Sequence, residues 1–242
     1  MKTVAIVQAR MGSTRLPGKV LKQINGLSVL GHVIDRLRRV PSIDELWIAT
    51  TSKKNDDPIE DEARRLNIQV YRGSEDDVLD RYYRTAKKAG AEAVLRVTSD
   101  CPLIEPAVVE DLICLYRESG SDYASNTLER TYPRGLDAEI FSFSALETAW
   151  TQASRPYERE HVTPYLYQHP DVFRCATQRG SEDYSHYRWT LDTEEDWELI
   201  RTIFEKCRYE GPYITFEDAK VLLFHYPELN KINAHVEQKK LV

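Results

Sequence analysis

The sequence predicts an α/β protein with a mainly parallel, twisted sheet and helices on both faces. Strand-like apolar runs alternate with helical patterns through the first half of the chain, and these runs are almost continuously apolar. Such strands are typical of parallel sheets that helices cover on both faces. A length of 242 residues is enough to bury a core without disulfides. We therefore expect one domain over residues 1–242, with a protruding subdomain in about 127–187.

Each element of the first half has its own signal. Four short apolar runs predict strands: residues 4–7, 46–50, 70–71 and 93–97. Helices are predicted to begin at Ser28 as an N-cap, at Asp57 before Pro58, at a capping box in residues 74–77, and at Pro106. In each of these helices the apolar residues recur at helical spacing, so one face of the helix packs on the sheet.

The second half of the chain has weaker signals. Its predicted elements are three strands, at residues 139–143, 173–175 and 188–191, and a helix, a break and a second helix over residues 144–168. Two capping boxes predict later helices, Thr193 with Asp196 and Thr215 with Asp218. No internal repeat or long linker divides the chain.

Charge and cysteine content exclude several classes of protein. The formal net charge is −6 and no long basic face is available, which argues against a nucleic-acid partner. No apolar run approaches the ~20 residues that span a bilayer, and the N-terminus lacks the pattern of a signal peptide. The four cysteines form no CxxC pair. We therefore expect a cytoplasmic protein without membrane association.

The loop at residues 8–19 follows the first predicted strand and combines glycine, hydroxyl residues and positive charge without any acid. Its three cations are Arg10, Arg15 and Lys19. It is not a Walker A motif, because Val20 stands where a hydroxyl would bind magnesium. Gly12 and Ser13 can still expose backbone N–H groups, and an arginine can bind phosphate through two hydrogen bonds. The pattern favours a polyphosphate site over its alternative, a surface turn with incidental basic residues.

Two aspartates at predicted strand ends could supply the magnesium ligands that this loop lacks. Asp100 follows the fourth predicted strand, and Asp192 precedes the helix capped by Thr193. Mg²⁺ usually takes one or two carboxylates and completes its coordination with water and phosphate oxygens. The structural alternatives are a turn residue for Asp100 and an accessory cap for Asp192.

Other clusters predict less. His161 and His169 have no third ligand in register for zinc, and no GxSxG motif supports a nucleophilic serine. Residues 132–139 mix a bend with both charge signs, which fits either a solvated hairpin turn or a ligand contact.

Residues 8–19, QARMGSTRLPGK, resemble the signature loop of the cytidylyltransferases that activate sugar acids, which include the CMP-KDO and CMP-acylneuraminate synthetases. Residues 99–104 are similar to the Asp-x-Pro-Leu segment of that family, and residues 191–196 to its late Asp-Thr-x-x-Asp segment. Residues 72–82 and 132–139 are similar to a narrower branch, that of spore coat polysaccharide biosynthesis protein F.

The resemblance implies a Rossmann-like nucleotidyltransferase fold and a Mg²⁺-dependent transfer of CMP from CTP to a sugar, with release of pyrophosphate. It implies catalytic roles for Arg10, Lys19, Asp100 and Asp192, with Mg²⁺ held by Asp100 and Asp192. The implied nucleotide-binding residues are Ala9, Arg10, Met11, Gly12, Ser13, Arg15, Lys19, Gly73 and Ser74. A homodimer is also implied by the family.

Selection of the sugar is predicted to lie in the second half of the chain. The residues expected to contact the sugar are Asn126, Arg134, Asp137, Glu139 and His161. An arginine there would suit a substrate carboxylate.

Two other functions stay open at this point. A glycosyltransferase that uses a nucleotide-sugar would favour an Asp-x-Asp motif at a strand end, and the chain has none. A non-catalytic nucleotide-binding protein could instead dock a partner through the tail at residues 227–242, and would bind CTP without releasing pyrophosphate.

Overall fold

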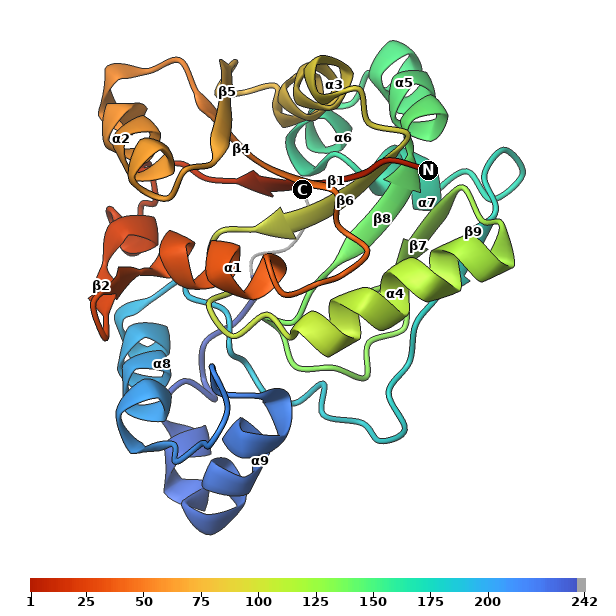
Figure 1. Ribbon diagram of the computed structural model, residues 1–242. Helices are drawn as coiled ribbons and strands as arrows, with labels where there is room; N and C mark the ends of the chain where they lie inside the picture. The colour runs from red at the N-terminus through yellow and green to blue at the C-terminus, as the bar shows by residue number, and fades with distance from the viewer. Residues whose placement is uncertain (239–242) are drawn as a thin grey trace.

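The computed structural model describes residues 1–238 and shows one seven-stranded sheet (Figure 1). Its strands are β1 (Thr3–Gln8), β4 (Glu45–Thr51), β5 (Gln69–Gly73), β6 (Ala93–Thr98), β7 (Tyr123–Ser125), β8 (Glu139–Ser142) and β9 (Cys175–Thr177). They are ordered β5-β4-β1-β6-β8-β7-β9. Within this sheet β8 runs against both of its neighbours, and every other pairing is parallel. The predicted fold class, a mainly parallel sheet, is confirmed.

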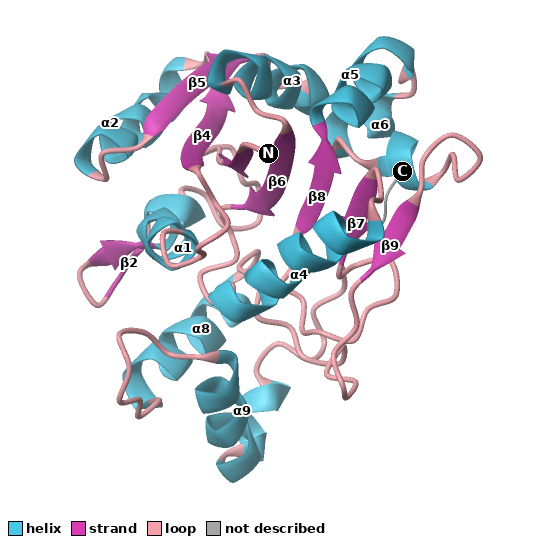
Figure 2. Ribbon diagram, turned by 45° about the vertical axis from the view of Figure 1, so that its right-hand side comes forward, coloured by secondary structure: helices cyan, strands magenta, loops and turns pink. Residues whose placement is uncertain are grey.

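Helices cover both faces of the sheet, as Figures 1 and 2 show. One face packs against α1 (Val29–Leu37), α2 (Asp57–Arg65) and α4 (Pro106–Ser119). The other packs against α3 (Val78–Ala89), α5 (Phe143–Gln152), α6 (Pro156–His161) and α7 (Pro164–Tyr167). The remaining helices, α8 (Glu194–Lys206) and α9 (Phe216–His225), lie beyond one end of the sheet.

The two-sided burial explains why the strands read as continuous apolar runs. In β1, Ala5 and Val7 belong to the core under α1, whereas Val4 and Ile6 belong to the core under α3. Successive side chains of a strand point to opposite faces, so a strand covered on both sides needs an apolar residue at every position.

A third apolar cluster ties the opening loop to the end of the chain. Leu16 of that loop packs with Trp189 and Leu191 and with the inner faces of α8 and α9. All three residues are almost completely buried. The loop is therefore held against the C-terminal helices by packing, before any ligand binds.

The order of the strands creates a crevice beside β1. The chain passes from β1 to β4 and β5 on one side, and then returns to β6 on the other side of β1. Ligands of open α/β sheets bind outside the carboxyl ends of strands at such a reversal. Ala9 follows β1 and Ser99 follows β6, so both loops that the sequence indicated meet at this crevice.

Most predicted boundaries hold to within a residue or two, and the departures have local causes. Ser28 caps α1 as expected, with Gly31 donating to its Oγ at 2.8 Å. Residues 74–77 do begin a helix, but its cap is Asp77, which accepts from the backbone of Asp80 at 2.9 Å. The strand predicted to reach residue 143 ends at Ser142, because that serine caps α5.

The strand predicted at residues 188–191 is wrong. In this segment Arg188 forms one isolated bridge to Arg134, the N–H of Trp189 donates to the carbonyl of Arg134, and Thr190 and Leu191 bond to Asp100 instead of to a strand. Two features were not predicted, strand β7 and a hairpin of β2 (Gln23–Ile24) and β3 (Leu27–Ser28), because both are too short to carry a periodic pattern.

Residues 127–187 contribute β8 and β9 to the same sheet, and the protruding subdomain stays a prediction. Over residues 1–238 no helix is long and apolar enough to cross a membrane.

A substitution at Gly135 tests the close approach of its backbone to the backbone of Trp189. Its φ is +105°, and an added Cβ would lie 2.5 Å from the backbone carbonyl of Trp189. Gly135→Ala is expected to lower the free energy of unfolding by at least about 3 kcal/mol, since steric overlap adds to the conformational cost. Gly26→Ala is the control, because Gly26 has φ +82° and open space around it. Equal losses for both variants in urea unfolding would contradict the close approach.

Candidate active site

Asp100 and Asp192 lie side by side at the crevice, although 92 positions separate them in the sequence. The connection is a backbone hydrogen bond, in which the N–H of Leu191 donates to the carbonyl of Asp100 at 2.8 Å. Thr190 adds a hydroxyl contact to the same carbonyl at 3.4 Å. The segment before α8 is thus tied to the loop after β6, and two carboxylates face one point.

Lys19 occupies that point. Its Nζ donates to Asp100 Oδ2 at 2.8 Å, to Asp192 Oδ1 at 2.8 Å, and to the carbonyl of Leu191 at 2.7 Å. A short 3₁₀ helix, Lys19–Leu21, directs the side chain inward from the opening loop. The ammonium has three donors and all three are used, so its position is well determined.

The electrostatics of this triad favour the charged forms of Lys19 and Asp100. Burial by itself lowers the pKa of Lys19, but the two carboxylates outweigh it, and the pKa lies above its ordinary value. Burial likewise opposes ionisation of Asp100, and the Lys19 ammonium reverses the effect, so the pKa of Asp100 lies below its ordinary value. Lys19 and Asp100 are therefore both charged near neutral pH.

The three loop cations have different surroundings. Arg15 pairs with Asp192, with Nη2 3.0 Å from Oδ2. Lys19 is paired as described, whereas Arg10 is exposed and forms no ion pair with any residue from 1 to 238. The loop carries no acid of its own, yet the tertiary structure brings acids to two of its cations.

The backbone of the predicted phosphate loop is bonded to Asp56, a residue that the sequence analysis did not single out. The backbone N–H of Met11 donates to Asp56 Oδ1 at 2.6 Å, and Thr51 donates its hydroxyl to the other carboxylate oxygen. Ser13 turns its N–H back to the carbonyl of Met11 at 2.9 Å. The N–H of Gly12 has no acceptor within the described chain. Of the two predicted backbone donors, that of Gly12 is therefore available and that of Ser13 is engaged.

The turn at Gly73 and Ser74 lies next to this loop. An added Cβ at Gly12 would approach Glu75 Oε1 at 3.6 Å. Arg81, a buried residue of α3, donates to the carbonyls of Ser74 and Glu75 and so fixes the turn. Ala9 is buried at the end of β1, with its N–H bonded to Ala49. The turn at Gly73 and Ser74 therefore lies close to Gly12, whereas Ala9 is buried at the base of the loop.

Two residues predicted to contact the sugar are engaged inside the protein. Asn126 is 1% exposed, donates to the carbonyl of Leu136 at 2.7 Å and accepts from the N–H of Ala138 at 3.0 Å. Glu139 is 6% exposed and accepts from Tyr123 and Thr163, each at 2.6 Å, and from Arg96. In this structure both side chains bond to neighbouring segments of the protein, and their contact with a sugar stays a prediction.

The other three residues lie nearer to solvent. Asp137 pairs with Arg130, while His161 is partly buried at the end of α6. The side chain of Arg134 makes no hydrogen bond or ion pair within residues 1–238. Burial lowers the pKa of Arg134, and the neighbouring Arg130 lowers it further. The carboxylate of Asp137 acts in the opposite direction, but Arg134 forms no ion pair with it or with any other residue from 1 to 238.

The donor set of the two aspartates fits magnesium. Asp100 Oδ2 and Asp192 Oδ1 converge on one cation, here the Lys19 ammonium, and carboxylate oxygens are the ligands that Mg²⁺ prefers. Among the described residues no group of three or more His, Cys, Asp or Glu side chains is arranged for a metal. Most ligands of a magnesium ion would therefore have to be water and substrate oxygens, which is usual for this ion at phosphate sites.

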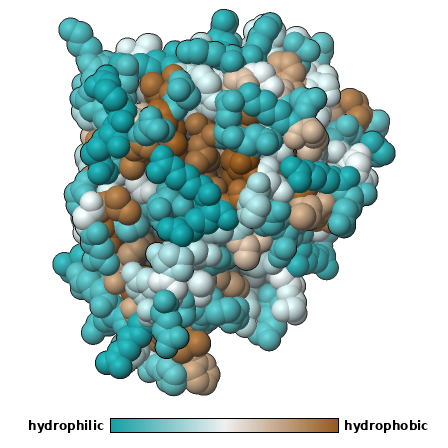
Figure 3. Space-filling view, viewed as in Figure 1, coloured by the Kyte–Doolittle hydropathy of each residue, from teal (hydrophilic) through white to brown (hydrophobic). Residues whose placement is uncertain are grey.

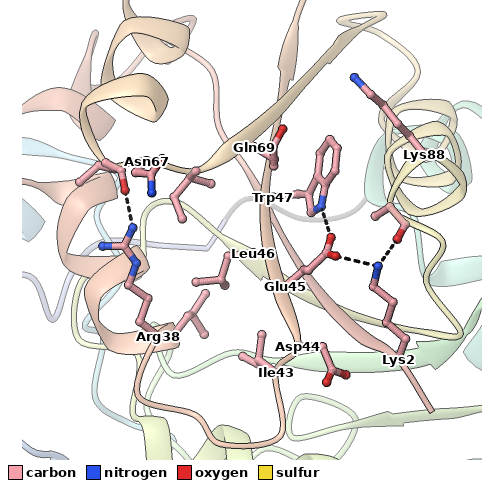
Figure 4. A pocket seen from close by; sticks show the side chains of 14 residues that line it. Lys2, Arg38, Ile43, Asp44, Glu45, Leu46, Trp47, Asn67, Gln69 and Lys88 are labelled. Carbon is pink, nitrogen blue, oxygen red and sulfur yellow. Dashed lines mark hydrogen bonds and ion pairs between the residues drawn. The ribbon is translucent and has the colours of Figure 1, made fainter.

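A cavity of about 1080 Å³ lies at the opposite end of the strands (Figure 4). It includes Lys2, just before β1, and the first residues of β4 and β5. Its central polar groups satisfy one another, since Glu45 accepts from Lys2 at 2.7 Å and from Trp47 at 3.0 Å. Figure 3 shows an apolar hollow framed by hydrophilic side chains on the face seen in Figure 1. Size alone therefore does not locate the active site.

The cytidylyltransferase family model matches residues 4–240 of this sequence. The chain belongs to the cytidylyltransferase family. The spore coat polysaccharide biosynthesis protein SpsF of Bacillus subtilis is 34% identical over 230 residues, which cover 92% of this chain and 94% of that protein. A solved cytidylyltransferase structure from Leptospira borgpetersenii has a TM-score of 0.90 and 31% identity, and covers 99% of both chains. A 3-deoxy-manno-octulosonate cytidylyltransferase of Geobacter sulfurreducens is 36% identical over 121 residues, 49% of this chain and 47% of that protein.

The family and fold predicted from the opening motif are confirmed, and the protein is a nucleotidyltransferase. Residues that sequence reading missed are Asp56, Arg81 and Arg188, each of which contacts a predicted site residue or its backbone. Asp56 and Arg188 lie outside the motifs named above, and Arg81 lies within residues 72–82 but was given no role, because each of the three acts through a tertiary contact.

The charge triad predicts a pH-dependent loss of stability in Lys19→Met. The lowered pKa of Asp100 contributes stability above the unfolded value of about 4, and the raised pKa of Lys19 contributes stability below about 10. Between these limits the variant should be less stable by about 2 kcal/mol in urea unfolding. The difference should shrink as the pH falls through the native pKa of Asp100. A difference that stays constant down to about pH 3 would contradict the pairing.

Proposed function

We propose that this enzyme is a Mg²⁺-dependent cytidylyltransferase that transfers CMP from CTP to a sugar acid and releases pyrophosphate. The observation that carries the proposal is the junction of Lys19, Asp100 and Asp192 beside a loop that also presents Arg10 and Arg15. The product, a CMP-sugar, would serve the synthesis of surface or spore-coat polysaccharide, as the name of the SpsF relative suggests. We place the reaction in the cytoplasm, consistent with four free cysteines.

The chain's own residues would position and neutralise the triphosphate. Arg10, exposed and without an ion pair in the described chain, is available to phosphate oxygens at once. Arg15 and Lys19 would exchange their aspartate partners for phosphate oxygens, which carry more negative charge. The N–H of Gly12 adds a donor to the same surface. Phosphoryl and nucleotidyl transfers depend mainly on such positioning and charge stabilisation.

Asp100 and Asp192 would hold Mg²⁺, which when bound polarises phosphate oxygens and acidifies a coordinated hydroxyl. Their two carboxylates provide oxygen ligands on the side of the crevice reached by the segments after β6 and before α8. The sugar hydroxyl attacks the α-phosphorus in line while pyrophosphate departs toward the loop cations. The loop thus gathers the charge that develops on the leaving group.

Arg134 supports a sugar acid as the acceptor. It is partly buried and close to Arg130, Asp137 and Arg188, and it forms no ion pair within residues 1–238. A guanidinium in this state gains most from a carboxylate, through two parallel hydrogen bonds. Its backbone is bonded to Tyr187 and Trp189, in the segment that leads to Asp192, so it lies on the same side of the crevice. CTP, a sugar acid and a second copy of the chain are the partners that we propose.

The two alternative functions have less support. A glycosyltransferase would need an Asp-x-Asp motif, which the sequence lacks, whereas the aspartate pair here is assembled from distant segments. A purely binding role for the tail is also disfavoured, since Asn233 of the tail is buried and bonded to the interior. Residues 239–242 of that predicted tail lie outside the described residues.

Pyrophosphate release from each of the four NTPs, with Mg²⁺ and a panel of sugar acids, tests the proposal. Release should require CTP and one of the acids. Asp100→Asn and Asp192→Asn should each raise the activation barrier by several kcal/mol, which lowers turnover on the order of 10³-fold. Lys19→Ala should lower it by about 10²–10³-fold.

Asp171→Asn provides the control for these substitutions, because Asp171 is exposed in the segment between α7 and β9. It should retain full turnover. Tight CTP binding without pyrophosphate release, for every acid tested, would favour the non-catalytic alternative and overturn the transferase proposal.

Arg134→Ala should raise the KM for the sugar acid by about 10- to 100-fold, the loss of one charge-assisted contact. The KM for CTP should not change. Arg174→Ala is the matched control, because the Arg174 side chain is 76% exposed and lies at the far edge of the sheet. A rise in the KM for CTP alone would instead place Arg134 with the nucleotide.

A further inference from the structure

Behind Asp192 lies a guanidinium that is bonded through all three of its nitrogens. Arg188 donates from Nη2 to Asp192 Oδ2 at 3.0 Å and from Nη1 to Gln238 at 2.7 Å. It also donates from Nε and Nη2 to the two carboxylate oxygens of Asp196, at 2.9 and 3.0 Å. Its side chain is 7% exposed. Arg188 is therefore fixed in place, whatever binds in the crevice.

Asp196 links this guanidinium to the backbone of Asp192 itself. The carboxylate is completely buried. Its Oδ2 accepts from the N–H of Asp192 at 2.9 Å and from the N–H of Thr193 at 3.1 Å. Both the backbone and the side chain of Asp192 are thus anchored to the same buried ion pair, at the first turn of α8.

The network is completed from the far end of the chain. Asn233 is 3% exposed, and its Nδ2 donates to Asp196 Oδ1 and to the carbonyl of Arg188, each at 2.8 Å. Figure 1 shows the chain after α9 running back toward the sheet, which brings this segment behind α8. One amide therefore joins the acid, the arginine and the C-terminal segment.

The three cations around Asp192 differ in their freedom to move. Arg15 is 38% exposed and makes a single ion pair, so it can turn toward a triphosphate. Lys19 is 11% exposed and is held by Asp100, Asp192 and the carbonyl of Leu191. Arg188 cannot follow Arg15, because Asp196 and Gln238 hold it. When Arg15 leaves, Arg188 still holds Oδ2, and Oδ1 keeps the direction in which it now shares Lys19 with Asp100.

We propose that Arg188, Asp196 and Asn233 form a clamp that positions Asp192 for the divalent cation. The C-terminal segment at residues 227–238 is then a structural part of the metal site, although it contributes no ligand. The inference rests on the proposed binding of Mg²⁺ by Asp100 and Asp192. Outer partners of metal ligands typically account for 10- to 100-fold in affinity, because they fix the orientation of the ligand.

Binding of Mn²⁺ to the full-length protein with CTP, followed by electron paramagnetic resonance, tests the clamp without a turnover assay. Asn233→Ala should weaken Mn²⁺ binding by about 10- to 100-fold. CTP binding in the presence of a chelator should be unchanged. Asn230→Ala is the matched control, since Asn230 belongs to the same segment, bonds to the carbonyl of Leu223 at 3.4 Å and does not touch the clamp.

Arg188→Lys examines the other end of the clamp, because it keeps the charge and removes the forked geometry. It should show the same loss of Mn²⁺ affinity while near-ultraviolet circular dichroism confirms the native fold. If either folded variant binds Mn²⁺ as tightly as Asn230→Ala, the clamp is overturned. Pyrophosphate release by the unmodified enzyme tests the proposed function separately, so loss of the clamp alone would leave that result intact.

Discussion

The rest of the structure depends on the ion-pair triad of Lys19, Asp100 and Asp192. It joins the loop after β1, the loop after β6 and the start of α8 at one point. Three segments that are distant in sequence meet there because the reversal of strand order beside β1 leaves a crevice, and because opposite charges satisfy one another within it. Without Lys19 two carboxylates would face each other in a partly buried site, which is costly.

The cations of the site differ in how firmly they are held. Arg15 makes one ion pair, whereas Arg188 behind Asp192 is held by a buried carboxylate and by the C-terminal segment. In the proposed reaction such a site is organised before the substrate arrives, and the cations of the opening loop would exchange an aspartate for a phosphate when the triphosphate binds. Preorganisation of this type is the main physical source of electrostatic catalysis.

The apolar core explains why this arrangement persists without ligands. Leu16 anchors the opening loop in the same cluster as Leu191, which precedes Asp192. Packing therefore brings the two halves of the site together, and the hydrogen bond between Leu191 and Asp100 sets their register. The cavity at the amino ends of the strands has no comparable convergence of charged side chains from distant segments, so we place the active site at the crevice from the charges and not from the volume.

The sequence alone determined the fold class and the succession of strands and helices along the first half of the chain. It also singled out Lys19, Asp100 and Asp192, because apolar periodicity, capping residues and the opening motif are local signals. It also predicted helix starts at Ser28, Thr193 and Thr215 correctly. Only the tertiary structure decided that Arg15 and Lys19 are already paired with acids, that Asn126 and Glu139 are engaged in the interior, and that Asn233 supports Asp192. The physical reason is that each of these facts is a contact between distant segments, and such contacts leave no periodic trace in the chain.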